Sequence, residues 1–226
     1  SHACALTSEG RVYCWGYNSV GELGDGTTTW QATPVAVSTG GVLSGKTVTQ
    51  ISTGGDHTCA LASDGGVYCW GYNDYGQIGD GATTSRTVPV AVVTSGALAG
   101  KSITQIKGGI FHTCALASDG SAYCWGYNSA GNLGDGTTTQ HSTPVAVSTS
   151  GALAGKTVVQ IAASYYSTCA LTSDGAPYCW GNNGNGQLGD GTTTQHIVPT
   201  AVSISGALAG QFLTSISAGG YSAVAT

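Results

Sequence analysis

Hydrophobic and polar positions alternate along the chain in short runs that are separated by turn residues. Thr58 to Ala62 is one such run, Ser63-Asp64-Gly65 is a turn, and Val67 to Gly71 is a second run. The segment PVAVV from Pro89 and the segment Ser102 to Lys107 are two more. Runs of this length between Gly, Pro, Asp and Ser indicate β-strands, and no window has a helical period long enough to predict a helix. The pattern predicts an all-β chain.

The same pattern recurs every 55 residues, and two cysteines mark each copy. We expect one repeat domain over residues 1–226, with units starting near residues 2, 57, 112 and 167 and a partial C-terminal strand at 217–226. Four short strands in each period are the content of one blade of a β-propeller. The sequence therefore predicts a propeller of four-stranded blades, with about four repeats.

The composition excludes several classes of function. Eleven acidic and only six basic residues give a net charge of −5, which cannot neutralise a run of phosphates, so we expect no nucleic-acid partner. No apolar stretch approaches 18 residues, so we expect no membrane insertion. Hydrophobic residues make up 41% of the chain, enough to form a core, so disorder is excluded.

Four motifs of the repeat resemble a known family. CAL-x-SDG, VYCWG-x-N, GQ-x-GDG and a late P-V-x-V followed by V-x-QI together resemble the regulator of chromosome condensation repeat, over essentially the whole chain. The resemblance implies a β-propeller. That family usually closes a ring of about seven blades, whereas this chain carries barely more than four copies. We therefore expect a partial or small ring, completed by another chain or by N-terminal repeats missing before Ser1, and a natural C-terminus.

The cysteines follow the spacing C-x9-C across the first turn of each repeat. If Gly65 adopts the left-handed conformation, Leu61 lies opposite Val67, and Cys59 lies opposite Cys69 within disulfide reach. Zinc is a weaker alternative because its structural sites have shorter ligand spacing, and buried free thiols are the remaining alternative. We predict four disulfides: Cys4–Cys14, Cys59–Cys69, Cys114–Cys124 and Cys169–Cys179.

Disulfides indicate an oxidising compartment, so we expect an extracellular or cell-surface protein. The paired cysteines are not part of the eukaryotic pattern of the family, and the chain is similar in this respect to a secreted bacterial variant.

Three other residue types recur at fixed positions and favour structural roles. The aspartates of the GDG turns predict Asx turns, with a calcium loop as the alternative that lacks enough carboxylates: Asp25, Asp80, Asp135 and Asp190. Histidines at one position alternate with serine, which indicates a hydrogen-bonding strut: His2, His57, His112, Ser167 and Ser222. One tryptophan per repeat predicts packing between blades: Trp15, Trp70, Trp125 and Trp180.

Converging ionisable groups that catalysis would need are few in this sequence. His141 and His196 lie in the variable loop before the proline, where we expect them to be exposed to solvent. We therefore predict a protein that is not an enzyme and that uses no metal or cofactor.

The positions that differ between copies carry large side chains, and propeller loops project at the rims. Aromatic residues and arginine are typical anchors of protein interfaces, although packing between blades is an equal alternative for the aromatic residues. The candidate interaction surface comprises Trp30, Tyr75, Arg86, Phe111, Tyr165, Tyr166 and Tyr221.

The sequence as a whole favours an extracellular, non-catalytic propeller that acts as a scaffold or protein-interaction module. We expect a protein partner, or self-association on the cell surface through the rim or the terminal strands. Two alternatives stay open: a secreted enzyme inhibitor, because the family includes a β-lactamase inhibitor, and a carbohydrate-binding propeller that stacks glycans on rim aromatics.

Overall fold

The computed structural model describes residues 1–220 and 222–225, and within them the chain is built from antiparallel β-sheets. The first sheet contains β1 (His2–Leu6), β2 (Val12–Gly16) and β3 (Gln31–Ala36). The second contains β4 (Val48–Thr53), β5 (His57–Ala62), β6 (Val67–Gly71) and β7 (Arg86–Ala91). The third contains β8 (Ile103–Gly108), β9 (His112–Ala117), β10 (Ala122–Gly126) and β11 (His141–Ala146). The fourth contains β12 (Val158–Ala163), β13 (Ser167–Thr172), β14 (Pro177–Gly181) and β15 (His196–Ala201), and the last pair is β16 (Ile216–Gly219) and β17 (Ser222–Ala225).

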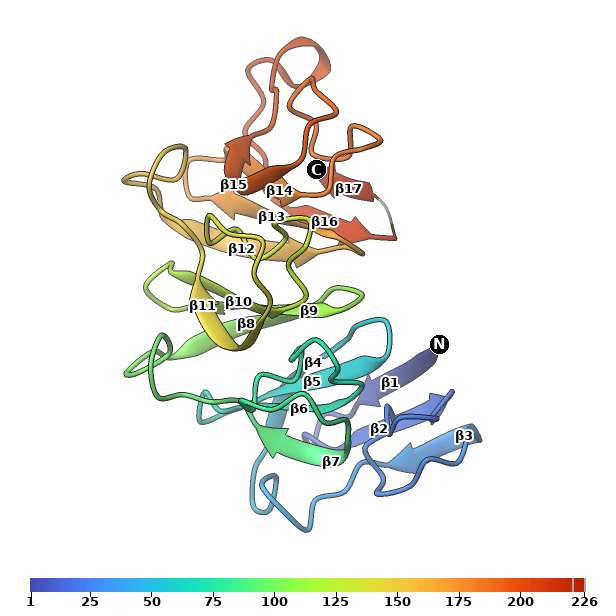
Figure 1. The fold of residues 1–226 in the computed structure, drawn as a ribbon. Coiled ribbons are helices and arrows are strands. Elements are labelled where there is room, and N and C mark those ends of the chain that lie inside the picture. The colour runs from blue at the N-terminus through green and yellow to red at the C-terminus, as the bar shows by residue number, and fades with distance from the viewer. Residues whose placement is uncertain (221, 226) are drawn as a thin grey trace.

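These sheets are the blades of a propeller and follow one another in chain order (Figure 1). The innermost strands of neighbouring blades, β4, β8, β12 and β16, lie next to one another around a common axis. The hydrophobic core lies between blades: Val67 and Ile78 of the second blade pack in one cluster with Ile106 and Trp125 of the third. The prediction of an all-β propeller with four-stranded blades is confirmed.

The sequence repeat and the blade are out of phase by one strand. The segment predicted as the last strand of a repeat, Ser102 to Lys107, forms β8, which pairs with β9 of the next blade. The loop over residues 92–102 carries the chain from the outermost strand of one blade to the innermost strand of the next. The sequence pattern suggested that a 55-residue unit starting near residue 57 forms one sheet. In the structure the last strand of that unit belongs to the next sheet.

The strand predicted to open at Pro89 begins three residues earlier, at Arg86, and ends at Ala91. It is the outermost strand of its blade, where a proline removes no ladder hydrogen bond. The pairing shifts register between Cys69 and Gly71, so that Gly71 lies opposite Arg86. The alternation in the sequence was therefore interrupted by a bulge at the start of this strand.

The predicted hairpin and its disulfide are confirmed. Gly65 has φ 80°, Leu61 lies opposite Val67, and Cys59 lies opposite Cys69 with their Cα atoms 4.1 Å apart. The other three cysteine pairs have the same separation and are also disulfide-bonded: Cys4–Cys14, Cys114–Cys124 and Cys169–Cys179. In the described part of the chain, no helix has the length and apolar character needed to cross a bilayer.

Candidate functional site

Each blade presents loops at two ends. At one end lie the loops between its first and second strands and between its third and fourth strands; we call this end the aromatic rim. It consists of loops 17–30, 54–56, 72–85, 109–111, 127–140, 164–166 and 182–195. At the other end lie the β-hairpins within the blades and the connections between blades; we call it the ion-pair rim. It consists of loops 7–11, 37–47, 63–66, 92–102, 118–121, 147–157, 173–176 and 202–215.

A buried asparagine holds each long loop of the aromatic rim. The Oδ1 atom of Asn73 accepts a hydrogen bond from the Ile78 backbone amide (3.0 Å), and its Nδ2 donates to the carbonyls of Ala82 and Thr84 (3.1 Å each). The Oδ1 atom of Asp80 accepts from the Ala82 amide at 3.0 Å, which is the predicted Asx turn. Asn18, Asn128 and Asn183 make the equivalent bonds. The loops are therefore fixed from within.

Hydrogen bonds between blades set the position of these loops relative to one another. The Gln77 carbonyl of the second blade accepts from Trp125 Nε1 (2.9 Å) and Thr113 Oγ1 (2.8 Å) of the third. His57 Nε2 bonds the same Thr113 hydroxyl at 2.8 Å. The tryptophans and histidines thus hold adjacent blades together, as their repetition in the sequence had indicated.

The inter-blade histidines are uncharged at neutral pH. His57 and His112 are fully buried, and burial lowers the pKa of His57 to about 3 and that of His112 to about 4. In the fourth blade Ser167 takes this position and hydrogen-bonds Ser164 at 2.6 Å. A buried neutral imidazole that serine replaces is a structural group.

His141 and His196 are partly exposed, with 31% and 28% of their side-chain surface accessible, and are not free in solvent, contrary to the prediction. Each begins the outermost strand of its blade, and its Nε2 reaches the aspartate of the adjoining loop, at 3.2 Å from Asp135 and 2.7 Å from Asp190. Arg86 occupies the same position in the second blade and pairs with Asp80 at 2.6 Å. The bulge in the preceding strand places this residue beside the Asx turn, which the linear sequence does not reveal.

Five aromatic side chains from three blades meet on the aromatic rim and form one surface. Their ring centroids lie 5.1 to 6.5 Å apart, with interplanar angles of 50° to 77°. All five are partly accessible to solvent. We call this group the aromatic surface; it consists of Tyr72, Tyr75, Phe111, Tyr127 and Tyr166.

The candidate interaction residues separate into distinct places. Tyr75, Phe111 and Tyr166 join the aromatic surface, and Tyr165 is the immediate neighbour of Tyr166. Trp30 is 64% exposed and packs on Tyr17 at 4.9 Å in the first blade. Arg86 is held by Asp80, and Tyr221 lies outside the described residues. The structure thus brings three of the seven candidates into direct contact.

Sequence reasoning missed Tyr72 and Tyr127. Both stand in the motif VYCWG-x-N, or its variant AYCWG-x-N, and the equivalent residue of the first copy is also tyrosine, Tyr17. The position is tyrosine in three of the four copies, so comparison between copies does not mark it as variable. The available signal was Asn182, which shows that the last copy does not need an aromatic ring there.

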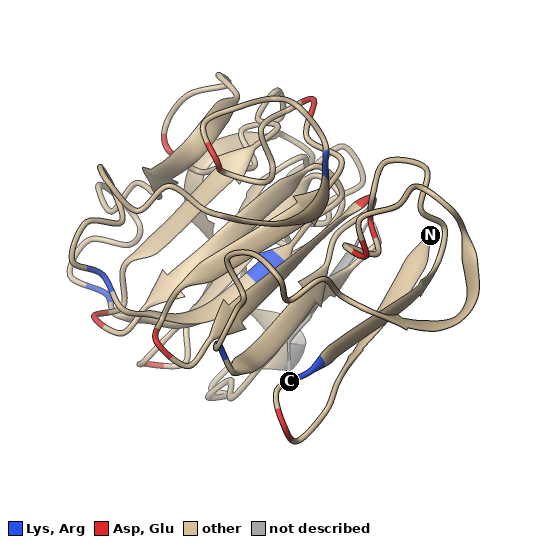
Figure 2. Ribbon diagram, turned by 90° about the horizontal axis from the view of Figure 1, so that it is seen from below, with Lys and Arg blue, Asp and Glu red and all other residues tan. Residues whose placement is uncertain are grey.

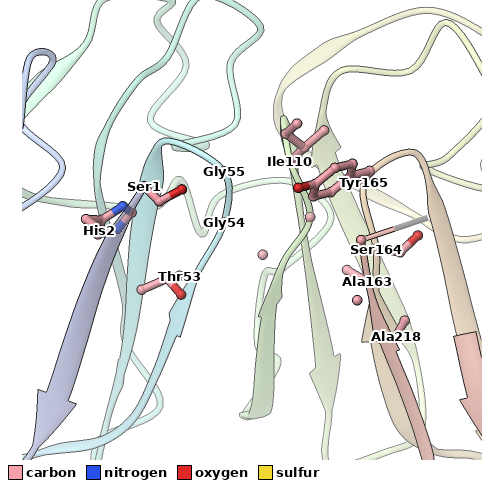
Figure 3. A pocket seen from close by; sticks show the side chains of 14 residues that line it. Ser1, His2, Thr53, Gly54, Gly55, Ile110, Ala163, Ser164, Tyr165 and Ala218 are labelled. Carbon is pink, nitrogen blue, oxygen red and sulfur yellow. The ribbon is translucent and has the colours of Figure 1, made fainter. Parts of the chain in front are cut away.

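A cavity of about 290 Å3 lies at the axis, next to the aromatic surface. Glycine-rich loops of successive blades line it, and Figure 3 shows Ser1 and His2 on one side facing Ile110 and Tyr165 on the other. Farther along the axis, Gln105 and Lys107 line a second cavity of about 400 Å3. Neither cavity places a nucleophile beside a base and an orienting group, and the described residues contain no cluster of three or more metal-ligating side chains.

Similar proteins share this architecture. The Ultraviolet-B receptor UVR8 of Arabidopsis thaliana is 35% identical over 202 residues, which cover 89% of this chain and 44% of the receptor. The E3 ubiquitin-protein ligase HERC2 of Homo sapiens is 35% identical over 227 residues, which cover all of this chain and 4% of the ligase. The chain thus spans less than half the length of these two relatives.

Solved structures agree with the sequence relatives. Human WBSCR16 superposes with a TM-score of 0.83 at 27% identity, over 96% of this chain and 53% of that one. Prp20p of Saccharomyces cerevisiae, whose binding to Gsp1p and histones was characterised with its structure, gives a TM-score of 0.76 at 22% identity, over 97% and 52% of the two chains. Both structures share the fold of this chain. The model of the RCC1-like domain matches residues 1–225, and the chain belongs to this family.

Proposed function

We propose that this chain is an extracellular, non-catalytic protein-binding module that contacts its partner through the aromatic surface. The observation that carries the proposal is the meeting of five aromatic rings from three blades at one rim. Tyrosine and phenylalanine supply large contact areas with little conformational entropy to lose, and such residues dominate the energetics of protein interfaces.

The support beneath the aromatic surface favours recognition by a rigid binding site. Tyr72 and Tyr75 belong to the loop that Asn73 fixes from within, and Phe111 precedes the buried strut His112. A preorganised surface loses less entropy when a partner binds than a mobile loop does. His57 and His112 are buried between blades, and His141 and His196 are each bound to the aspartate of the adjoining loop, which favours binding over catalysis.

The four disulfides support the extracellular location, because such bonds persist in oxidising compartments. The experiment is an intact-mass measurement on the protein isolated from its native source, alkylated with and without prior reduction. We expect alkylation of all eight cysteines only after reduction. Alkylation without reduction would contradict the extracellular assignment while leaving the binding surface in place.

The binding function is tested with a matched pair of phenylalanine variants. Phe111→Ala removes the ring that contacts four others in the aromatic surface, whereas Phe212→Ala removes an exposed ring at the ion-pair rim. We expect a partner, recovered by cross-linking to the wild-type protein and measured by calorimetry, to bind Phe212→Ala normally and Phe111→Ala at least ~10-fold more weakly. Equal binding to both variants would reject the aromatic surface as the site, and binding of a glycan alone would favour the carbohydrate alternative.

Self-association is a second candidate, favoured by one observation on β1. In the described residues β1 pairs only with β2, whereas its counterparts β5, β9 and β13 are paired on both sides. An unpaired strand edge is a template for strand addition, either by a second copy of the chain or by residues that precede Ser1 in a longer protein. Sedimentation equilibrium tests this: we expect a dimer at micromolar concentration, and a strictly monomeric mass would reject it.

A further inference from the structure

The acidic and basic side chains are distributed unequally between the two rims. Seven of the eleven acidic residues belong to the aromatic rim, and the one basic residue beside it is Arg86 at the start of β7, which Asp80 already pairs. The ion-pair rim carries four acidic and four basic residues, and Lys107 lies between the rims on β8. Figure 2 shows that most charged positions lie in loops and at strand ends. The net negative charge of the protein therefore belongs to the rim that bears the aromatic surface.

The Asp74 carboxylate contacts the aromatic surface directly, and Asp56 lies close enough to act on Tyr72 through its charge. Asp74 Oδ2 accepts a hydrogen bond from the Tyr72 hydroxyl at 3.1 Å. The Asp56 backbone carbonyl accepts from the Tyr72 amide at 2.8 Å, and Asp56 occupies in the second blade the position of Phe111 in the third. Burial, with Asp74 and Asp56 adding to it, raises the pKa of Tyr72 to about 12. The rings thus lie in a field of negative charge.

At the ion-pair rim, by contrast, the aspartates of three hairpins are neutralised by lysines of the same chain. Lys46, Lys101 and Lys156 each bond the aspartate of the hairpin in the same blade, respectively Asp64, Asp119 and Asp174. Asp56 and Asp74 have no such basic partner among the described residues. These two carboxylates are therefore available to a cation of a binding partner.

We propose that the aromatic surface with Asp56 and Asp74 binds arginine side chains of the partner protein. This inference rests on the proposed function and names the chemistry of the partner. The faces of aromatic rings are negative and attract cations, and the guanidinium group stacks flat on such rings while it hydrogen-bonds a carboxylate. Tilted rings beside two carboxylates suit this combination, and the negative rim steers a basic partner toward it.

The experiment uses three synthetic peptides that alternate Gly-Ser with Arg, Leu or Glu, and measures amide shifts of the whole protein by NMR. We expect the Arg peptide to move the signals of residues 72–75, 111 and 127, the Leu peptide to bind more weakly, and the Glu peptide to have no effect. Asp74→Asn keeps an acceptor for the Tyr72 hydroxyl but removes the charge. It should weaken the Arg peptide about 2- to 5-fold, which is the range expected for one exposed cation contact.

The control is Asp119→Asn, which removes a carboxylate of the ion-pair rim and should leave binding of the Arg peptide unchanged. A Leu peptide that binds the same signals as tightly as the Arg peptide would overturn the inference while leaving the proposed function standing. An Asp74→Asn variant with unchanged affinity for the Arg peptide would also overturn it. If no peptide moves the signals of the aromatic surface, the inference about arginine fails, and the proposed function is decided separately by partner binding to Phe111→Ala and Phe212→Ala.

Discussion

The two rims arise from one repeat, yet different interactions hold them. Loops of the aromatic rim are fixed by buried, uncharged groups such as Asn73 and Trp125, whose hydrogen bonds are shielded from water. Each hairpin of the ion-pair rim is joined to the connection that leads into its blade by an exposed pair such as Lys101 and Asp119, 2.7 Å apart. Exposed pairs are screened by salt and add little stability, whereas buried neutral hydrogen bonds are not screened. The aromatic rim, whose surface residues vary between copies, is therefore held by stronger interactions than the ion-pair rim.

The largest expected effect is the loss of a tryptophan beneath the aromatic rim. Trp125 is fully buried and donates to the Gln77 carbonyl, so Trp125→Ala leaves a cavity and an unpaired acceptor. We expect the free energy of unfolding to fall by about 3–5 kcal/mol, measured by chemical denaturation. Trp30→Ala, which removes a ring that is 64% exposed, is the matched control and should cost about 1 kcal/mol or less. Similar losses in both variants would contradict the account of this rim.

Acid should weaken the aromatic rim through its buried histidines. An ordinary histidine in the unfolded chain takes up a proton near pH 6.5, whereas folded His57 does so near pH 3. The unfolded state thus binds more protons in this interval, and stability falls as the pH decreases from 6.5 toward 3. Above pH 6.5 the contribution is fully present. For His57 the full loss amounts to about 5 kcal/mol and is reached only near pH 3, and His112 acts in the same direction down to about pH 4.

Denaturation midpoints between pH 7 and pH 4.5 test this. Asp119, whose ordinary pKa is 3.8, changes charge at lower pH. Burial raises the pKa of Glu22 above 4.5, so its protonation favours the folded state and opposes a decline. A decline in this interval therefore comes from the inter-blade histidines, which include His2, whose pKa burial lowers to about 4. The double variant His57→Ser and His112→Ser copies the residue that the fourth blade has at this position. It should start with lower stability and lose less of it on acidification. An unchanged slope would show that these imidazoles are not the groups that titrate.

A smaller effect separates support from recognition within the aromatic rim. Asn73→Ala should cost about 2 kcal/mol, because the Ile78 amide and two carbonyls lose their partner. It should also weaken the Arg peptide, since Tyr72 and Tyr75 flank it. Asn183→Ala removes the equivalent bonds from a loop without aromatic residues and should cost the same stability with no change in peptide affinity. Equal effects of the two variants on affinity would contradict the assignment of the site.

The sequence predicted the repeated parts of the molecule well, because four copies of a 55-residue repeat allow equivalent positions to be compared with one another. Opposed cysteines such as Cys59 and Cys69, the turn at Gly65 and the buried Trp70 all followed from spacing and local turn geometry. The phase of the blade did not follow. Strand pairing between β8 and β9 is decided by packing of adjacent sheets, and a repeat carries no mark of where its sheet begins.

Comparison of equivalent positions between copies also predicted part of the candidate site. Phe111 and Tyr166 were found because they differ from Asp56 in an aligned position. Tyr127 was missed because its place in the aromatic surface depends on contacts with Tyr75 and Tyr166 in other loops. A comparison of aligned positions between copies does not reveal those contacts. The placement of His141 beside Asp135 depends on a bulge that shifts the strand register. Contacts between loops of different blades require the three-dimensional arrangement.

The smallest expected effect lies at the ion-pair rim and completes the comparison. Lys101 holds the pKa of the Asp119 carboxyl down at about 2, yet both side chains remain in contact with water. Lys101→Ala should therefore return the pKa of Asp119 toward its ordinary value in an NMR titration while the denaturation midpoint changes little. Added salt should make the change in denaturation midpoint of Lys101→Ala smaller still, because salt screens exposed charges. The loss of unfolding free energy caused by Trp125→Ala should be the same at low and high salt. Lys156→Ala at the next blade is a replicate of the test. A large, salt-independent loss in either lysine variant would mean that the ion pairs support the fold as firmly as the buried groups do, and the difference between the two rims would disappear.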